Sequence, residues 1–566
     1  MSWPYEFILD LSPEDKQLRR ESIAFYALVA HSSAFAPALA YLLFRLGLTL
    51  YTRVRGPASY QFVPGSPVAK ARQATSLGGL EARWVRLAWW MSDPVYLFGV
   101  HYGHRDEWIL GSGWAAWMLL LCVLGTGRDY LHLTKRFGLV AVSQMPIQYL
   151  LSLKNLNPFC WVFGSSHEQV NRYHRVLGHI IFALVELHVI FYNIFLISAG
   201  KWTSRFFAPD VFAGVVASLA MTSLCTTALS VLRNYSYRLF FIVHVIAALV
   251  IPPLIWFHAH SARLYLVEAL AVFLIDLVVR RITTITSPAT VEVVPGTDLI
   301  KIEANLPPAT LAKYQASPGS HVYLSLPAES RPSQNLTSKS SLLYEFIYNP
   351  FTVASTNSDT NTITLVVRNQ AGPLTNRLNM LSASDATVQL NVLGPYGAVS
   401  KSISNILNGG FDSVLLFAGG VGATFALPIY RAILHEAPST RVRLIWAIRS
   451  AAEATWATAS VSGDAAGDSV LADDNVQLFL TGDMGVHEGG RGGGEGLEMS
   501  DMRGGGNHKR PNIGGIVDDT FRTGMHDSVA VMVCGPADMA RNVRTSLKVW
   551  VNKGRRVWWH DETFGW

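Results

Sequence analysis

The first half of the chain consists largely of apolar stretches long enough to cross a membrane. A bilayer core about 30 Å thick takes roughly 20 helical residues. Seven apolar stretches near this length precede Thr283, at 23–51, 107–127, 137–153, 173–198, 211–232, 238–258 and 262–279. The stretch 137–153 is the weakest of them. This pattern predicts an α-helical transmembrane bundle of about seven helices.

After Ile282 the apolar runs shorten, and apolar residues alternate with polar ones. Such runs, separated by Pro, Gly and Asn turns, lie at 290–294, 299–304, 321–326 and 362–367. A period of two predicts half-buried strands, so we expect a small β-barrel. From Asp412 short apolar strands alternate with helical stretches, which predicts an α/β nucleotide-binding domain.

These patterns predict a multi-domain chain with four regions. They are an N-terminal region with the first transmembrane helix and a cytosolic loop (1–106), the transmembrane domain (107–282), the barrel (283–398) and the α/β domain (411–566). Within the α/β domain, residues 483–516 are rich in Gly and cannot bury a core. We therefore expect a disordered insertion there.

Composition and charge support the membrane assignment and predict its orientation. The chain is 50% hydrophobic and 15% charged, which excludes an ordinary soluble protein. Seven Lys and Arg residues lie in 52–106, so this loop is expected in the cytosol, the N-terminus outside and everything after Arg281 inside. Residues 1–20 contain no apolar core flanked by positive charge, so no cleaved signal peptide is expected. The four cysteines form no C-x-x-C pair, which argues against a disulfide framework and against a zinc or iron–sulfur site.

Two of the predicted membrane helices each carry a histidine pair at the same spacing. His174 and His188 lie in one helix and His244 and His258 in another, each pair 14 residues apart. That separation is close to four helical turns, so both imidazoles of a helix emerge on one face about 21 Å apart. One crossing separates the two helices, which therefore run parallel. His174 then faces His244 near the cytosol and His188 faces His258 toward the outside, which predicts axial ligands for two stacked b-type haems.

A single intramembrane histidine more often makes a simple hydrogen bond than binds a metal. The repeated spacing favours ligation here, because polar groups at bilayer depth are costly and tend to mark function. His179 and His260 do not share the spacing and are expected beside the sites or at an interface. For Glu186, Glu268 and Asp276 a satisfied polar contact is the favoured interpretation over a proton or metal path.

Two strings in the barrel offer groups to a phosphate-bearing cofactor. In NPFTVAS (349–355), Pro and Phe set an extended turn and the Thr and Ser hydroxyls are available. In RNQAGPLTNRL (368–378), Gly372 and Thr375 could open a helix whose amides face a pyrophosphate.

Two further strings lie at strand ends of the α/β domain, after GPYG (394–397) has closed the barrel. FAGGVGAT (417–424) leads from a strand into a helix, so its glycines allow backbone to approach phosphates closely. CGP (534–536) ends a later strand, where open α/β sheets bind ligands.

These strings, in this order after this membrane half, resemble the ferric reductase and NADPH oxidase family, whose dehydrogenase part is similar to ferredoxin-NADP reductase. The resemblance runs from about Trp114 to Trp566 and rests on the paired histidines, PFT, GPYG, GGVGAT, CGP and the chain end ETFGW. It implies FAD, two b-type haems and NADPH as cofactors, with FAD on the barrel and the nucleotide on the α/β domain.

The resemblance also implies the site residues. FAD would contact Asn349, Pro350, Phe351, Thr352 and Ser355, and the nicotinamide nucleotide would lie against Gly419, Gly420, Gly422, Thr424, Cys534, Gly535 and Pro536. Phe564 or Trp566 would stack on the isoalloxazine ring. Many members have His where this chain has Asn349, and Asn can hydrogen-bond but carries no charge. Arg449 ends the strand RLIWAI, where a cation could pair a ribose 2′-phosphate, which favours NADPH.

Three functions fit these features. A ferric or cupric metalloreductase is favoured, because both histidine pairs have thirteen intervening residues, whereas the oxidases usually have one pair shortened to twelve. The extra first helix and the basic loop 52–106 also resemble the reductases. A superoxide-forming NADPH oxidase is the alternative, and a haem-binding channel would leave the flavin motif without a purpose. Metal ions and membrane lipid are the expected partners, nucleic acid is not, and protein partners are left open. The plasma membrane is favoured over the vacuolar membrane.

Overall fold

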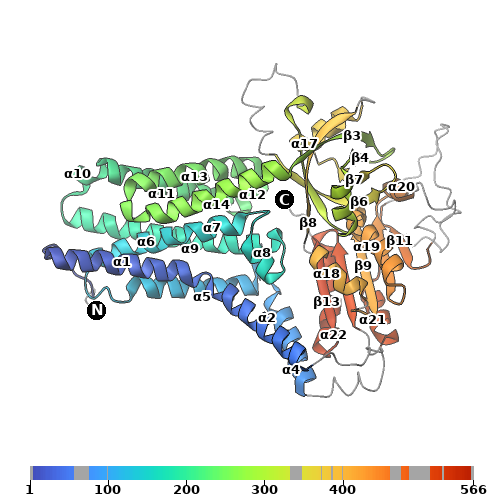
Figure 1. Ribbon diagram of the computed structural model, residues 1–566, viewed down its shortest axis with the longest axis horizontal. Helices are drawn as coiled ribbons and strands as arrows, with labels where there is room; N and C mark the ends of the chain where they lie inside the picture. Colours follow the sequence, from blue (N-terminus) through green and yellow to red (C-terminus); the bar gives the residue numbers. More distant parts are fainter. Residues whose placement is uncertain are drawn as a thin grey trace. The chain divides into compact units, whose positions relative to one another are not determined.

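A computed structural model gives the fold of most of the chain. It describes residues 4–55, 76–98, 100–331, 347–370, 372–383, 387–397, 399–408, 410–458, 473–482, 510–524 and 528–562. The chain divides into two compact units, a helical one that contains residues 4–55 and 89–281 and a second one that begins at Ile282 and also includes residues 76–88. The predicted fold class, a membrane helix bundle followed by a β-barrel and an α/β domain, is confirmed (Figure 1).

All seven predicted apolar segments are helical. The helices before the barrel are α1 (Pro13–Ser33), α2 (Ala36–Arg55), α4 (Ser76–Met91), α5 (Arg105–Val123), α6 (Tyr130–Ser143), α7 (Met145–Ser152), α8 (Pro158–Phe163), α9 (His167–Ser198), α10 (Trp202–Phe206), α11 (Pro209–Ala228), α12 (Ser230–Tyr235), α13 (Tyr237–His258) and α14 (Arg263–Thr283). A short hairpin of β1 (Pro94–Leu97) and β2 (Val100–His104) precedes α5. Three helices, α9, α11 and α13, are long and apolar enough to cross a membrane alone within the described ranges, and α1 with α2 makes a fourth if this pair, bent by 41°, is one span.

Three predicted spans differ in detail from single straight helices, and one of them, 211–232, divides after Ala228 into α11 and α12. The segment 137–153 is divided between α6 and α7 at Gln144, because Pro146 in the first turn of α7 has no N–H to continue the helical hydrogen bonds. The first span, 23–51, likewise divides after Ser33 into α1 and α2. α5, with Arg105, Asp106 and Glu107 at one end, and α14, with charged residues along its length, are not among the three helices named above as long and apolar enough to cross a membrane alone.

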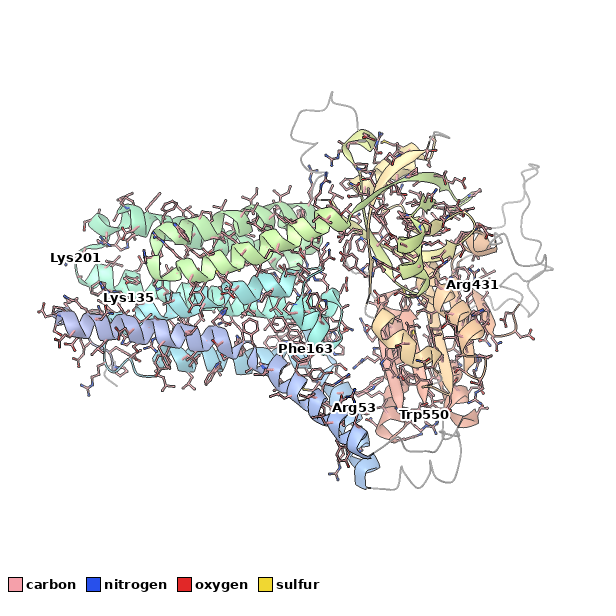
Figure 2. All side chains as sticks on the ribbon, viewed as in Figure 1. Arg53, Lys135, Phe163, Lys201, Arg431 and Trp550 are labelled. Carbon is pink, nitrogen blue, oxygen red and sulfur yellow. The ribbon has the colours of Figure 1, made fainter. Side chains whose placement is uncertain are left out.

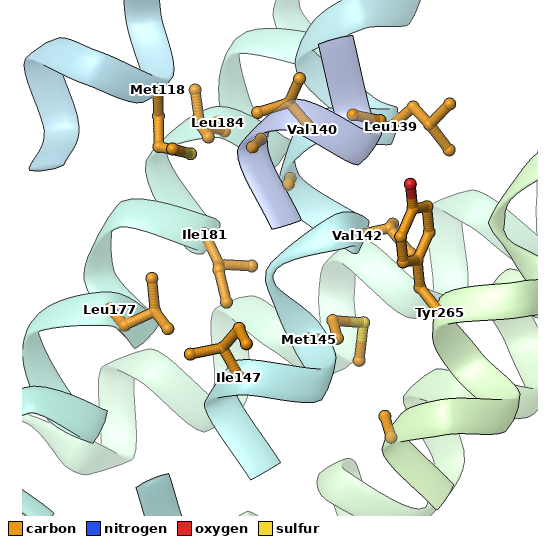
Figure 3. Packing of buried hydrophobic residues seen from close by; sticks show 14 of the residues in the cluster. Met118, Leu139, Val140, Val142, Met145, Ile147, Leu177, Ile181, Leu184 and Tyr265 are labelled. Carbon is orange, nitrogen blue, oxygen red and sulfur yellow. The ribbon is translucent and has the colours of Figure 1, made fainter. Parts of the chain in front are cut away.

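Buried apolar side chains from several helices form one core. Met118 of α5, Val140 of α6 and Leu184 of α9 are each at most 2% exposed and converge in this core (Figure 3). Because lipid tails are as apolar as leucine, close packing rather than exclusion of water holds such helices together. Lys201 and Lys135 lie toward one end of the bundle and Phe163 toward the other (Figure 2).

The second unit begins with a closed six-stranded barrel. Its strands are β3 (Ile285–Val293), β4 (Leu299–Asn305), β5 (His321–Ser325), β6 (Asn349–Asn357), β7 (Thr362–Arg368) and β8 (Val388–Tyr396), in the order β3-β4-β7-β6-β5-β8. Neighbouring strands are antiparallel. Ser287, Ala289 and Val291 of β3 are buried while the residues between them are exposed, as the alternation predicts. Helices α15 (Pro308–Gln315) and α17 (Pro373–Leu381) belong to this part.

The α/β domain has a five-stranded, fully parallel sheet. Its strands are β9 (Ser413–Gly419), β10 (Arg441–Ile448), β11 (Val476–Leu480), β12 (Val529–Cys534) and β13 (Val557–Glu562), in the order β11-β10-β9-β12-β13. The helices are α18 (Val399–Leu407), α19 (Ala423–Glu436), α20 (Thr455–Thr458), α21 (Ile513–Thr523) and α22 (Ala537–Asn552). The strand order reverses direction at β9 and β12, the position where such sheets bind ligands.

The insertion predicted at 483–516 ends earlier than expected. Residues 510–516 are described, and α21 begins at Ile513 with the Asn512 side chain accepting a hydrogen bond from the Gly515 N–H at 3.0 Å. Val517 and Phe521 of this helix are buried, so the helix contributes to the core. The rest of the predicted insertion, 483–509, lies outside the described residues.

Candidate functional sites

The four histidines predicted as ligands form two facing pairs inside the helical unit. The ring centroids of His174 and His244 are 6.1 Å apart, and those of His188 and His258 are 6.2 Å apart. One member of each pair comes from α9 and the other from α13, as the equal spacing predicts. The structure therefore brings together the expected residues at two levels of the bundle.

Three of the four rings are held through one nitrogen by a backbone carbonyl. The Nδ1 atoms of the two α9 histidines lie 2.9 Å (His174) and 2.8 Å (His188) from the carbonyl oxygens of Gln148 and Thr134. His258 Nδ1 lies 2.8 Å from the carbonyl of Asp210. A carbonyl can only accept, so each Nδ1 carries the proton and the lone pair is on Nε2.

The fourth ring, His244, has no such partner. Its Nδ1 is buried and makes no hydrogen bond within the described part of the chain. The Gln148 side-chain amide nitrogen lies 3.4 Å from His174 Nε2, so any hydrogen bond to this histidine nitrogen is long and weak. The inner pair is therefore less rigidly held than the outer pair.

The separation of the rings fits a metal ion between them. Because metal–imidazole nitrogen bonds are about 2.0–2.1 Å long, two rings on opposite sides of one ion have centroids about 6 Å apart. No group of three or more His, Cys, Asp or Glu that could hold a metal lies in the described ranges. A group that takes only two protein ligands and supplies the remaining ones itself, as haem does, matches this donor set.

Two glycines that sequence reasoning missed allow the outer histidines to approach their carbonyl partners. A Cβ at Gly138 would lie 2.8 Å from His188 Nδ1, and a Cβ at Gly214 would lie 2.5 Å from His258 Nδ1. Each glycine is four residues after the residue whose carbonyl accepts from the histidine, Thr134 on α6 and Asp210 on α11, and so lies on the same helical face. This repeated spacing is a signal that the sequence contains.

The other intramembrane polar residues have protein partners, as the simpler interpretation expected. Glu268 of α14 lies 3.3 Å from His31 Nε2 of α1, and Asp276 pairs with Arg280 at 2.9 Å. The Thr222 hydroxyl donates to Glu186 at 3.4 Å. The pairing of His31 with Glu268 was not foreseen from the sequence, because nothing in the pattern places α1 beside α14.

In the barrel, the predicted flavin-binding string forms most of β6. Thr352 is buried and lies opposite His321 of β5, whereas Ser355 is half-buried near the far end of the strand. Helix α17 follows β7, which pairs with β6. It begins after Gly372, as predicted, and the Gly372 N–H donates to the Thr375 hydroxyl oxygen at 3.1 Å. Pro350 and Phe351 are both half-buried on β6.

The two strings of the α/β domain lie side by side at the carboxyl ends of adjacent strands. Cys534 of β12 pairs in register with Ala418 of β9. A Cβ at Gly419 would meet the Pro536 ring at 2.5 Å, and one at Gly422 would collide with the Cys534 carbonyl. Gly420 has φ +54°, a backbone conformation that favours glycine. Gly535 and Thr424 belong to the same two turns.

The glycine-rich turn also lies next to the barrel. α19, which it opens, packs against β6, and the barrel residue Gly319 is so close to α19 that a Cβ there would lie 2.7 Å from Ile429. Arg368 at the end of β7 forms an ion pair with Glu453 at 2.9 Å. The flavin and nucleotide strings are thus neighbours within one unit.

The remaining predicted residues lie at this edge or outside the described chain. Arg449 is exposed and follows β10, the neighbour of β9. Burial raises the pKa of the Cys534 thiol far above its ordinary value, so this residue stays a neutral thiol. Glu562 of β13 lies beside Cys534 of β12. Its carboxylate is 2.7 Å from His560 Nε2, and the sequence did not suggest this hydrogen-bonded pair. Phe564 and Trp566 lie outside the described residues.

The fold and these sites define an integral membrane protein whose second unit contains a closed β-barrel and a parallel α/β domain. Three families match successive parts of the chain: "Ferric reductase like transmembrane component" at residues 137–255, "FAD-binding domain" at 283–400 and "Ferric reductase NAD binding domain" at 411–548. The chain therefore belongs to the ferric reductase family, and it has FAD-binding and NAD-binding domains.

Relatives with curated names agree with this assignment. The chain is 24% identical to "Ferric/cupric reductase transmembrane component 2" of Schizosaccharomyces pombe, covering 75% of this chain and 80% of that one. It is 26% identical to "Probable metalloreductase AIM14" of Meyerozyma guilliermondii, covering 60% of this chain and 64% of that one. It is also 26% identical to "Ferric reductase transmembrane component 1" of S. pombe, of which it spans 60%.

Among solved structures, phthalate dioxygenase reductase matches at 15% identity with a TM-score of 0.30, covering 50% of this chain and 69% of that one. The fold assignment rests on the strand orders of the chain itself.

Proposed function

We propose that this protein is a transmembrane metalloreductase. It passes electrons from cytosolic NADPH through FAD and two b-type haems to ferric or cupric ions on the opposite side of the membrane. The observation that carries the proposal is the two facing imidazole pairs, with ring centroids 6.1 and 6.2 Å apart, in a chain that also has FAD-binding and NAD-binding domains.

His174 and His244 would hold the inner haem, and His188 and His258 the outer one. When bound, flavin takes two electrons from a nicotinamide as hydride and releases them singly, and haem iron takes up and releases single electrons. The carbonyls of Thr134 and Asp210 keep the protons of the outer histidines on Nδ1, so that each Nε2 lone pair would be available to bind the haem iron. No acid–base catalyst is required at either pair.

The residues of the soluble unit bind and orient the electron donor. Asn349, Pro350, Phe351, Thr352 and Ser355 would contact FAD, and the first turn of α17, with Gly372 and Thr375, would face its pyrophosphate. The turns at 419–424 and 534–536 would hold the nicotinamide nucleotide against the flavin. Arg449 would pair the 2′-phosphate of NADPH, and Phe564 or Trp566 would cover the flavin ring until the nucleotide displaces it.

The proposed direction of electron transfer is supported by the charge of the loops. Seven cations in 52–106 favour the cytosol for that loop, and with it for the soluble unit. The His174 pair, near α8, would then be the cytosolic one, and the His188 pair, near α10, the outer one. Electrons would leave at the α10 end. The plasma membrane is the proposed location, with the vacuolar membrane as the alternative.

A superoxide-forming NADPH oxidase is the second candidate. One observation favours it: the described ranges contain no cluster that could hold a metal ion, and oxygen needs none. The equal spacing of the two histidine pairs and the printed names of the relatives favour metal as the acceptor.

The test is electron delivery by purified, FAD-loaded and haem-loaded protein in lipid nanodiscs, with NADPH or NADH as donor. Ferric chelate, cupric ion and oxygen are offered in turn, with and without superoxide dismutase. A metalloreductase reduces metal at a rate that the dismutase does not change. Loss of metal reduction in the presence of the dismutase would mean that superoxide is the real product, and no haem reduction by either nucleotide would contradict both candidates.

A further inference from the structure

The four facing histidines are not held alike. His174, His188 and His258 each hold Nδ1 against a backbone carbonyl, at 2.9, 2.8 and 2.8 Å. The buried Nδ1 of His244 makes no hydrogen bond within the described part of the chain. The Phe240 ring, one helical turn earlier on α13, lies beside the His244 ring, with centroids 5.2 Å apart. The outer pair is therefore anchored on both sides and the inner pair on one side.

The carbonyls that hold the α9 histidines follow the same spacing as the histidines themselves. The Thr134 carbonyl holds His188, and the Gln148 carbonyl holds His174. Thr134 and Gln148 are 14 residues apart, as the two histidines are. The segment of α6 and α7 therefore runs antiparallel to α9 and in register with it, so a step of about 21 Å along one is matched along the other.

The same register on α11 identifies a carbonyl at the level of His244. α11 packs along α13 (Figure 1), and the Asp210 carbonyl at the start of α11 holds His258 at the end of α13. The residue 14 positions after Asp210 is Leu224, so its carbonyl lies at the level of His244. Leu224 also packs against the apolar core of the bundle, which places this turn of α11 among the packed helices.

The Leu224 carbonyl already has a side-chain donor. In a helix, one lone pair of a carbonyl oxygen serves the helical N–H and the other is left over. At Leu224 the Thr227 hydroxyl donates to this oxygen at 3.1 Å, and it also donates to the Ser223 carbonyl at 2.9 Å. The oxygen that the register offers to His244 is therefore occupied.

The glycine that admits a histidine at the outer level has no counterpart at the inner level of α11. Gly214 lies four residues after Asp210, and a Cβ there would be 2.5 Å from His258 Nδ1. The residue 14 positions after Gly214 is Ala228. A methyl group therefore occupies the space that a histidine Nδ1 takes at the outer level.

We propose that His244, whose Nδ1 meets no acceptor in the described helices, raises the reduction potential of the inner haem relative to the outer one, an inference that rests on the proposed function. A hydrogen bond from Nδ1 makes an imidazole a stronger donor to iron, and a stronger donor stabilises the ferric state. His244 is therefore the weakest donor of the four. It favours the state in which the inner iron has gained one electron (ferric to ferrous) and the outer iron has lost one (ferrous to ferric), and no bond or proton moves in that transfer.

The consequence concerns where a single electron rests. One electron in the chain would lie mainly at the inner pair, and the outer pair would fill when the flavin delivers the second electron of the same hydride. The competing explanation is that the His244 ring turns to another acceptor once iron is bound. In that case Thr227 and Ala228 have no influence on the potential.

Two substitutions on α11 restore the conditions for the fourth hydrogen bond. Thr227→Val frees the second lone pair of Leu224, and Ala228→Gly removes the Cβ. Thr226→Val, at an exposed position, and Ala220→Gly, at a half-buried position between the two histidine levels, are the matched controls. They repeat the loss of a hydroxyl and the loss of helix propensity without changing the surroundings of His244.

The experiment is a spectroelectrochemical titration of both haems in nanodiscs, with the His188→Leu variant, which keeps the inner haem, to identify the inner wave. The double variant Thr227→Val/Ala228→Gly should shift the electron partition about tenfold toward the outer haem, which is a fall of about 59 mV in the inner potential. Each single substitution should shift it about threefold and each control less than about twofold.

Ligand exchange gives a second measurement on the same variants. Cyanide should displace a histidine from the inner haem about tenfold more slowly in the double variant than in the wild type, because an anchored ring leaves the iron less readily. The rate at the outer haem should stay the same.

Three results would overturn the inference. They are an unchanged inner potential in the double variant, equal shifts in the double variant and the combined controls, and a shift of the outer haem as large as that of the inner one. If the double variant does not fold, as judged by its melting temperature, Thr227→Val alone decides. A wild type without haem would contradict the proposed function, whereas bound haems with unmoved potentials would contradict this inference alone.

Discussion

The helical unit and the soluble unit build their sites from different kinds of contact. In the helical unit, single side chains meet across helices that are far apart in sequence: His188 meets the Thr134 carbonyl 54 residues away, and His258 meets that of Asp210 48 residues away. In the α/β domain, the candidate residues are short strings at the ends of the neighbouring strands β9 and β12. A site built from single side chains should lose its function when one of those side chains is truncated. A site built from closely packed backbone should lose its function when a side-chain atom is added to one of its glycines.

The largest expected effect is the removal of an outer ligand. His188→Leu should abolish the outer haem signal and lower metal reduction about 100-fold or more, because a transfer chain fails at its missing member. Dye reduction at the flavin should persist. His179→Leu, an exposed histidine on the same helix, is the control and should keep both haem signals. Retention of the outer signal in His188→Leu would show that the ligand assignment is wrong.

The soluble site should respond to an added methyl group. In Gly422→Ala the new Cβ would collide with the Cys534 carbonyl, which as backbone cannot move aside. NADPH affinity should fall roughly 30-fold, the equivalent of about 2 kcal/mol, while both haem spectra stay unchanged. Titration of flavin fluorescence with NADPH measures this. Gly514→Ala, where the nearest atom is 3.8 Å away, is the matched control and should bind normally.

A glycine-to-alanine change beside the outer ligand His188 applies to the helical unit the same test that Gly422→Ala applies to the α/β domain. Gly138→Ala would set a Cβ 2.8 Å from His188 Nδ1 and should destabilise the outer site by about 1–3 kcal/mol, lowering haem occupancy and broadening its spectrum. Gly113→Ala on α5, with no atom within 4 Å, should be neutral or slightly stabilising. Equal haem occupancy in the two variants would mean that Gly138 is not a packing requirement.

The smallest expected effect concerns the choice of donor. Arg449→Gln removes an exposed cation at the edge where the nucleotide would bind. The preference for NADPH over NADH should fall about tenfold, since an exposed charge-assisted contact to phosphate is worth about 1.5 kcal/mol, the low end of the usual range. Steady-state kinetics with each nucleotide checks it. An unchanged preference for NADPH over NADH would show that a residue other than Arg449 binds the 2′-phosphate.

Most of the architecture follows from periodicity alone. The seven apolar segments, the alternating strands and the βα repeats correspond to helices, a barrel and a parallel sheet, because each pattern reflects which faces are buried. The break at Gln144 was harder to foresee, because Pro146 lies in an otherwise continuous apolar run. The start of α21 inside a Gly-rich stretch depends on burial of Val517 and Phe521, which composition does not reveal.

The site was predictable where its residues repeat a spacing and not where they depend on tertiary contacts. The four histidines came from one 14-residue interval seen twice. Gly138 and Gly214 could have been found from their four-residue distance to Thr134 and Asp210, but only once those carbonyls were known to face the histidines.

The most direct test of the central claim is the number of haems bound per polypeptide, measured by pyridine haemochrome assay against amino-acid analysis of the purified protein. Two facing imidazole pairs predict two haems in the wild type and one in a variant that lacks either His188 or His244. A wild-type ratio of one or zero, or an unchanged ratio after loss of either histidine, would contradict the account.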